Sequence, residues 1–141
     1  ASAAAFRPLQ RMLMALPVIG TSIRSLALSR LAWTLAVTTN TSMDAAKCIT
    51  LAIRNAQNVV YAGTIEPITA IIQQGRPMAE ALRSTGEYPS EFVDALEVGE
   101  DTGQLSEAME RMSRHYEDQA KAALAALAVF SGFDSIGTCT L

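Results

Sequence analysis

The ionisable residues that could carry out catalysis are few. His115 is the only histidine, so a Ser-His-Asp or Cys-His site would have to use it. It stands between Arg114 and Tyr116 in a segment with helical apolar spacing, which is typical of a solvated surface histidine. A di-iron helical bundle needs Glu-x-x-His pairs, and the residue three before His115 is Met112. We therefore expect no enzyme, and an enzyme that uses His115 stays an alternative hypothesis.

Carboxylates are concentrated in residues 80–110, where nine acidic side chains accompany one basic residue, Arg83. At 100° per residue from Phe92, three acids fall on the helix side opposite the apolar residues: Asp94, Glu97 and Asp101. Such a stripe fits a solvated helix face, a surface for a basic partner, or a site where oxygen ligands hold a hard cation. We take these three acids as the candidate partner surface and expect neither a metal nor a cofactor.

Three neighbouring residues in this segment suggest a helical hairpin. Glu100 lies on the flank of the apolar face, where a carboxylate requires a hydrogen-bond donor or a cation. Gly99, inside the expected helix, predicts a close helix crossing, because a helical glycine costs up to about 1 kcal/mol relative to alanine. Gly103 fits the left-handed residue that ends a helix.

Composition limits the class of protein. The chain has 141 residues, of which 50% are hydrophobic and 6% aromatic, and its net charge is -3. This favours one helical domain over a disordered chain, and it offers no basic footprint for nucleic acid. Residues 1–60 carry a net +5 and residues 61–141 a net -8. Two isolated cysteines, Cys48 and Cys139, are too few for a disulfide framework or a zinc site.

The apolar spacing predicts an all-α fold, a compact antiparallel bundle of about six helices. We expect the helices near residues 22–39, 43–57, 59–74, 77–84, 89–101 and 104–128, with a turn at Pro17 and Gly20. Thr41 and Asp44 resemble a capping box, and Pro67 should kink the third helix or delay its start. We expect Trp33 in the core. The longest uncharged runs, residues 31–43 and 122–133, are too short to span a bilayer.

The stretch from Val98 to Leu105 resembles the V-G-E-x-x-G-x-L signature of the type II secretion system F domain, and Tyr116-Glu117 resembles the Y-E that follows it. Upstream, Leu16-Pro17-Val18-Ile19-Gly20 is similar to the L-P-x-x-G entry of the second cytoplasmic copy of that domain. The residues that carry the resemblance are Pro17, Gly20, Gly75, Pro89, Gly99, Glu100, Gly103, Leu105 and Tyr116. Ser42 departs from the glycine usual before the second helix.

The resemblance implies a non-enzymatic scaffold from the inner-membrane platform protein of a type II secretion or type IV pilus machine. Such a domain lies at the cytoplasmic face of the bacterial inner membrane. It contacts the assembly ATPase, other platform subunits, and pilin or pseudopilin, and it self-associates. Its parent is embedded in the membrane although this chain has no predicted span. The alternative is a stand-alone helical protein that binds a divalent cation or small ligand through the acidic segment.

The resemblance also suggests how the chain is divided. Residues 6–128 are the expected F-type helical domain. Residues 1–5 are expected to be a linker or the edge of an excised piece, and residues 129–141 a tail that is truncated or derived from vector sequence.

Overall fold

The computed structural model describes the backbone of residues 2–139 and the side chains of Pro17 and residues 19–128. Over this part the only regular elements are helices, which confirms the all-α fold class. They are α1 (Ser2–Thr38), α2 (Ala45–Ala56), α3 (Val59–Ala62), α4 (Ile65–Gln73), α5 (Met78–Thr85), α6 (Ser90–Thr102) and α7 (Leu105–Cys139). None of the described helices is both long and apolar enough to cross a membrane.

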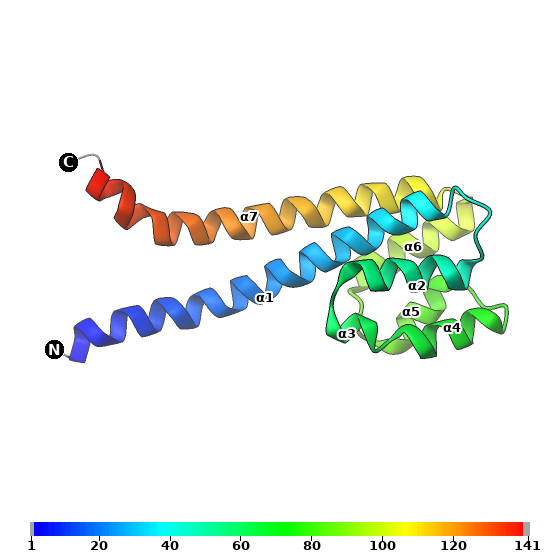
Figure 1. The fold of residues 1–141 in the computed structure, drawn as a ribbon, viewed down its shortest axis with the longest axis horizontal. Coiled ribbons are helices and arrows are strands. Elements are labelled where there is room, and N and C mark those ends of the chain that lie inside the picture. Colours follow the sequence, from blue (N-terminus) through cyan, green and yellow to red (C-terminus); the bar gives the residue numbers. More distant parts are fainter. Residues whose placement is uncertain (1, 140–141) are drawn as a thin grey trace.

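The two longest helices, α1 and α7, form an antiparallel hairpin whose free ends lie together, away from the short helices (Figure 1). Small residues line the seam between them, so the two backbones approach closely. The Ser113 hydroxyl donates to the carbonyl of Ser29 at 3.0 Å, and the Ser106 hydroxyl donates to the carbonyl of Ala36 at 2.7 Å. These bonds from α7 to the backbone of α1 fix the register of the hairpin.

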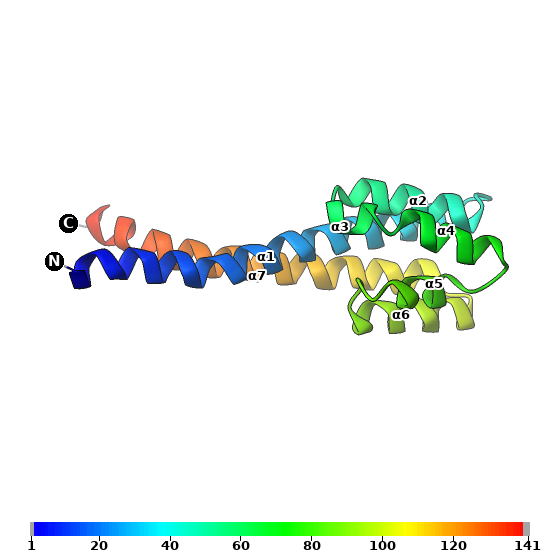
Figure 2. The same cartoon turned by 90° about the horizontal axis from the view of Figure 1, so that it is seen from below.

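The five short helices form a head at the other end of this hairpin. Helix α2 packs on α1, α6 packs on α7, and the head is completed by contacts of α4 with α2 and with α5. Figure 2 shows α2 and α4 on one side of the hairpin and α5 and α6 on the other. The antiparallel helix packing is as expected, while the hairpin extends well beyond the head.

The core fills the space between these layers. Its largest fully buried side chains come from helices α1 to α7: Leu28, Leu31, Leu35, Ile49, Ile53, Tyr61, Ile68, Leu82, Phe92, Val93, Leu96 and Met109. Tyr61 stacks on Tyr88 with ring centroids 4.7 Å apart, and Phe92 lies 6.2 Å from Tyr88 and 6.1 Å from Tyr116. This row of rings joins the two sides of the head, since Tyr61 belongs to α3 and Tyr116 to α7.

The expected turn at Pro17 and Gly20 is wrong, because both residues lie inside α1. Proline removes a helical hydrogen bond, but Pro17 is exposed, so water can reach the backbone that it leaves unpaired. The Thr21 hydroxyl also donates to the Pro17 carbonyl at 2.9 Å. A proline on a solvated helix face is therefore tolerated, and α1 begins far earlier than residue 22.

Two further local expectations are settled at α2 and α4. The capping box is wrong, because Asp44 is the N-cap residue of α2 without a side-chain cap bond, while the Thr41 hydroxyl donates to Thr38 O. The single helix expected near residues 59–74 is wrong, because the chain forms α3 and α4 there, and only α4 starts late, at Ile65. Pro67 occupies the first turn of α4, where an amide hydrogen has no helical partner.

The expectation that Trp33 lies in the core is wrong, because 54% of its surface is exposed. On this part of α1, leucines and alanines already supply the buried positions, among them Leu28, Leu31 and Leu35. Trp33 falls on the remaining narrow strip that faces solvent. The helix is apolar on almost every side, so its sequence did not distinguish the exposed strip.

The two buried tyrosines Tyr88 and Tyr116 provide a matched pair for a stability measurement. Burial raises the pKa of each to about 12. The Tyr88 hydroxyl lies 2.9 Å from the Thr64 hydroxyl, whereas the Tyr116 hydroxyl has no hydrogen-bond partner among the described residues. We expect Tyr88→Phe to cost about 1 kcal/mol of unfolding free energy and Tyr116→Phe to be neutral or stabilising. Urea melts measure both, and the reverse order would contradict this account of the two hydroxyls.

Candidate functional site

Glu100 joins the end of α6 to the beginning of α5. Its Oε2 accepts a hydrogen bond from the amide of Met78 at 2.9 Å, and its Oε1 accepts one from the amide of Ala79 at 2.8 Å. These are the first two amides of α5, whose N-cap residue is Pro77 and provides no side-chain cap. A carboxylate at a helix N-terminus is stabilised by the free amides and by the helix dipole. The donor that Glu100 requires is therefore the backbone of α5.

The turn from α6 to α7 is tight because of two glycines. A Cβ atom on Gly99 would lie 3.0 Å from Ala108 Cβ and 3.0 Å from Leu105 Cα, so the expected close crossing is present. Gly103 has φ 72°, the left-handed conformation that ends α6 as expected. Gln104 then donates its amide to the carbonyl of Gly99 at 2.9 Å. This turn holds Glu100 in place opposite α5.

Apart from Leu105, the remaining family-motif residues lie in separate parts of the fold. Leu105 begins α7 and contacts Gly99, and Tyr116 is buried in the core. Gly75 has φ 84° in the turn before α5, and Pro89 is the N-cap residue of α6. The structure thus brings Gly99, Glu100, Gly103 and Leu105 together, but not the others. Pro17 and Gly20 are exposed on α1.

The candidate partner surface on α6 is partly neutralised by α5. Arg83 Nη2 lies 2.7 Å from Glu97 Oε2 and 3.2 Å from Asp94 Oδ1. The two carboxylates raise the pKa of the Arg83 guanidinium, chiefly through the bond to Glu97. Asp101 is exposed and forms no ion pair within the described residues. The surface therefore stays acidic, although the Arg83 guanidinium neutralises part of its charge.

The surroundings of His115 and the possible metal ligands can be read from the described side chains. His115 Nε2 lies 3.1 Å from Glu91 Oε1 and 3.3 Å from Gln119 Nε2, and its ring meets Tyr116 edge-on. None of these neighbours is a serine or cysteine nucleophile. Among the described residues, no group of three or more histidine, cysteine, aspartate or glutamate side chains could hold a metal ion.

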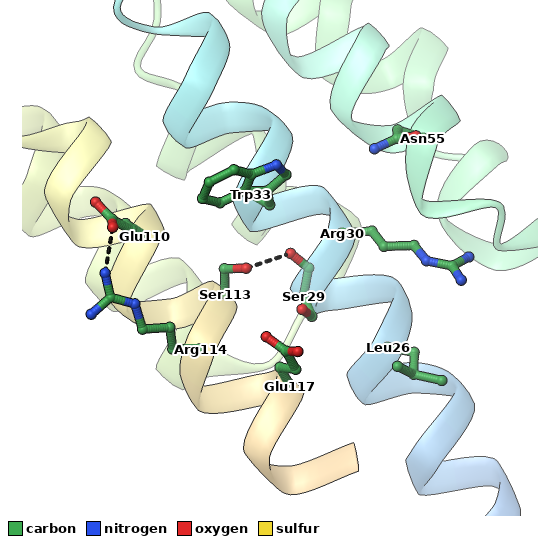
Figure 3. A pocket seen from close by; sticks show the side chains of 9 residues that line it. All are labelled: Leu26, Ser29, Arg30, Trp33, Asn55, Glu110, Ser113, Arg114 and Glu117. Carbon is green, nitrogen blue, oxygen red and sulfur yellow. Dashed lines mark hydrogen bonds and ion pairs between the residues drawn. The ribbon is translucent and has the colours of Figure 1, made fainter. Parts of the chain in front are cut away.

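A groove lies between α1 and α7 and also reaches α2 (Figure 3). It has a volume of about 600 Å³, and Trp33, Arg30 and Leu26 line it from α1. Glu110, which pairs with Arg114, and Glu117 contribute from α7. Sequence reasoning missed this groove because it depends on which strip of α1 is left uncovered. The only sequence feature that pointed to the groove was a single tryptophan in an alanine-rich helix.

The close crossing at Gly99 predicts a large loss of stability on substitution. Gly99→Leu should lower the free energy of unfolding by about 1–3 kcal/mol, because the added side chain meets the backbone of α7. Asp94→Ala, on the exposed side of the same helix, should change it much less. Denaturant melts of both variants and the parent decide. A Gly99→Leu midpoint at or above that of the parent, with an unchanged slope, would show that the crossing has room.

The Glu100 cap on α5 predicts a second loss of stability. Glu100→Ala should cost about 2–3 kcal/mol, because the first amides of α5 lose a charged acceptor in a half-buried place. Glu97→Ala is the matched control, three residues earlier on the same helix and paired only with exposed Arg83. Native-state hydrogen exchange should also accelerate at the amides of Met78 and Ala79 in Glu100→Ala alone. Equal protection of these amides in both variants would rule out the cap.

Comparisons with known proteins identify a family. The family model for type II secretion system (T2SS) protein F matches residues 32–132, which include the α6–α7 turn. The chain is 24% identical over 110 residues to "Type II secretion system protein F" of Pseudomonas aeruginosa, covering 78% of this chain and 27% of that protein. It is 27% identical over 122 residues to "Type IV pilus assembly protein PilC" of Thermus thermophilus, covering 86% of this chain and 30% of that protein.

A third relative is "Type IV pilus assembly protein PilC" of Myxococcus xanthus, which is 26% identical over 112 residues. The match covers 79% of this chain and 27% of that protein. No solved structure matches the chain. The chain spans less than a third of the length of these relatives. Because the family model covers most of the chain and the signature residues form its α6–α7 turn, this protein belongs to the type II secretion system protein F family.

Proposed function

We propose that this chain is a non-enzymatic scaffold domain of an inner-membrane platform protein in a type II secretion or type IV pilus machine. In this role it lies at the cytoplasmic face of the bacterial inner membrane. It contacts the assembly ATPase and other platform subunits and couples ATPase motion to the assembly of pilin or pseudopilin subunits. The match of the protein F family model over residues 32–132 is the observation that carries this proposal.

The architecture suits a scaffold. The head is held by a packed core on a two-helix hairpin, and the signature residues Gly99, Glu100 and Gly103 serve the joint between α5, α6 and α7. A rigid head transmits displacement without deforming, because close-packed interiors have low compressibility. With the free ends of α1 and α7 together, the head stands at one end of the domain, where partners can reach it (Figure 1).

The surface that we propose for the ATPase is the groove at Trp33. An exposed tryptophan next to arginines is the residue combination enriched in the energetic centres of protein interfaces. Arg30 and Arg114 line the same groove, together with Glu110 and Glu117. Trp33 is free to be buried by a partner, because 54% of its surface is exposed in this chain.

The proposal is tested with the purified chain and the assembly ATPase of the same organism. Biolayer interferometry should detect binding, and Trp33→Ala should weaken it by about tenfold or more, as expected for a central aromatic contact. Val59→Ala is the matched control, because Val59 is 90% exposed on α3, away from the groove. No binding of the parent chain would contradict the ATPase contact. Equal binding by Trp33→Ala and the parent would contradict the proposed surface.

The alternative function, cation or ligand binding through the acidic segment, gains no support from an observation. In that segment Glu100 caps α5 and Asp94 and Glu97 pair with Arg83, while Glu80, Glu91 and Glu110 contact Arg76, His115 and Arg114 respectively.

A further inference from the structure

The exposed face of α2 carries a basic, apolar, basic row. Lys47, Leu51 and Arg54 stand at positions i, i+4 and i+7, so they lie on one side of the helix within about 10.5 Å along its axis. All three are exposed, and Leu51 has 47% of its surface open. Neither cation forms an ion pair within the described part of the chain. This row is called the basic row below.

The basic row lines a groove of about 450 Å³ between α2 and α4. Its opposite wall consists of Ile65, Thr69 and Gln73 of α4, and Asp44 lies at the beginning of α2. The groove thus offers an apolar centre between two cations, with one carboxylate at its edge. Its shape and charge suit a helix that presents acidic residues around an aliphatic side chain.

The exposed face of α6 carries a row of the matching kind, with acidic residues around an aliphatic side chain. Asp94, Val98 and Asp101 have the same i, i+4, i+7 spacing, and all three are exposed, with 59% of the Val98 surface open. Asp94 shares Arg83 with Glu97, and its 3.2 Å contact is the longer of the two. An exposed pair of this kind contributes little to stability, so Asp94 can turn to another cation. This row is called the acidic row below.

We propose that the basic row of one copy of this chain docks on the acidic row of a second copy. A parallel alignment of α2 on α6 places Lys47 opposite Asp94 and Arg54 opposite Asp101. The same alignment places Leu51 against Val98, so two charge pairs flank one apolar contact. The match of spacing, charge and exposure selects a second copy over a partner of unrelated sequence.

The two rows lie on opposite sides of the hairpin, since α2 packs on α1 and α6 packs on α7 (Figure 2). A contact between different surfaces of identical subunits is heterologous and adds copies head to tail, in a ring or an open row. This inference rests on the proposed function, in which the domain contacts other platform subunits. It uses different residues from the Trp33 groove, so the two can fail separately.

Charge reversal tests the contact in the 141-residue chain. Sedimentation velocity at about 50 mM salt should show concentration-dependent association that weakens at about 500 mM salt, because ions screen exposed charges. Lys47→Glu with Arg54→Glu, and Asp94→Lys with Asp101→Lys, should each weaken association by about tenfold or more. In each doubly reversed chain the two rows carry charge of the same sign, so two copies of one variant repel each other at the proposed contact. An equimolar mixture restores opposite charges at both contacts and should associate as the parent does.

The control reverses two charges elsewhere: Arg111→Glu with Lys121→Glu on α7 should leave association unchanged. Circular dichroism melts establish that every variant is folded. A parent chain that stays monomeric up to about 1 mM would overturn the contact and leave ATPase binding to be judged by its own experiment. Association that survives both reversals, or a mixture that fails to restore it, would place self-association on another surface and overturn the proposal.

Discussion

The close contact between α1 and α7 sets the position of every other helix. Small residues let the two backbones approach, and the hydroxyls of Ser106 and Ser113 bind carbonyls of α1, so the register of the hairpin is fixed. Because α2 follows α1 and α6 leads into α7, this register also fixes where the two sides of the head stand. The aromatic row from Tyr61 to Tyr116 then joins these sides through the core.

The second joint is the α6–α7 turn, and its residues act on structure rather than on chemistry. Gly99 permits the crossing, Gly103 ends α6, and Glu100 caps α5 through two backbone amides. A carboxylate that accepts from the end of another helix fixes both position and direction of that helix. The signature of the protein F family therefore has a structural explanation, since its residues form the joint that holds α5, α6 and α7 together.

Folding also arranges charge. Residues 44–73, which include α2 to α4, carry two basic and two acidic side chains, whereas residues 76–104, which include α5 and α6, carry two basic and seven acidic ones. Arg83 on α5 lies beside the acids of α6 and pairs with two of them. The side of the head formed by α5 and α6 is therefore acidic, while the side formed by α2 to α4 has balanced charge.

The sequence by itself determined the helical class, the left-handed end of α6 at Gly103 and the crossing at Gly99, because these follow from local periodicity and backbone preference. It showed that Glu100 needed a donor, but only the tertiary structure decided that Met78 and Ala79, more than twenty residues away, would donate. Tertiary packing also left Trp33 exposed, and α1 runs on through Pro17, which faces solvent. Periodicity reports which faces are apolar, whereas neighbours far along the chain decide which of those faces are covered.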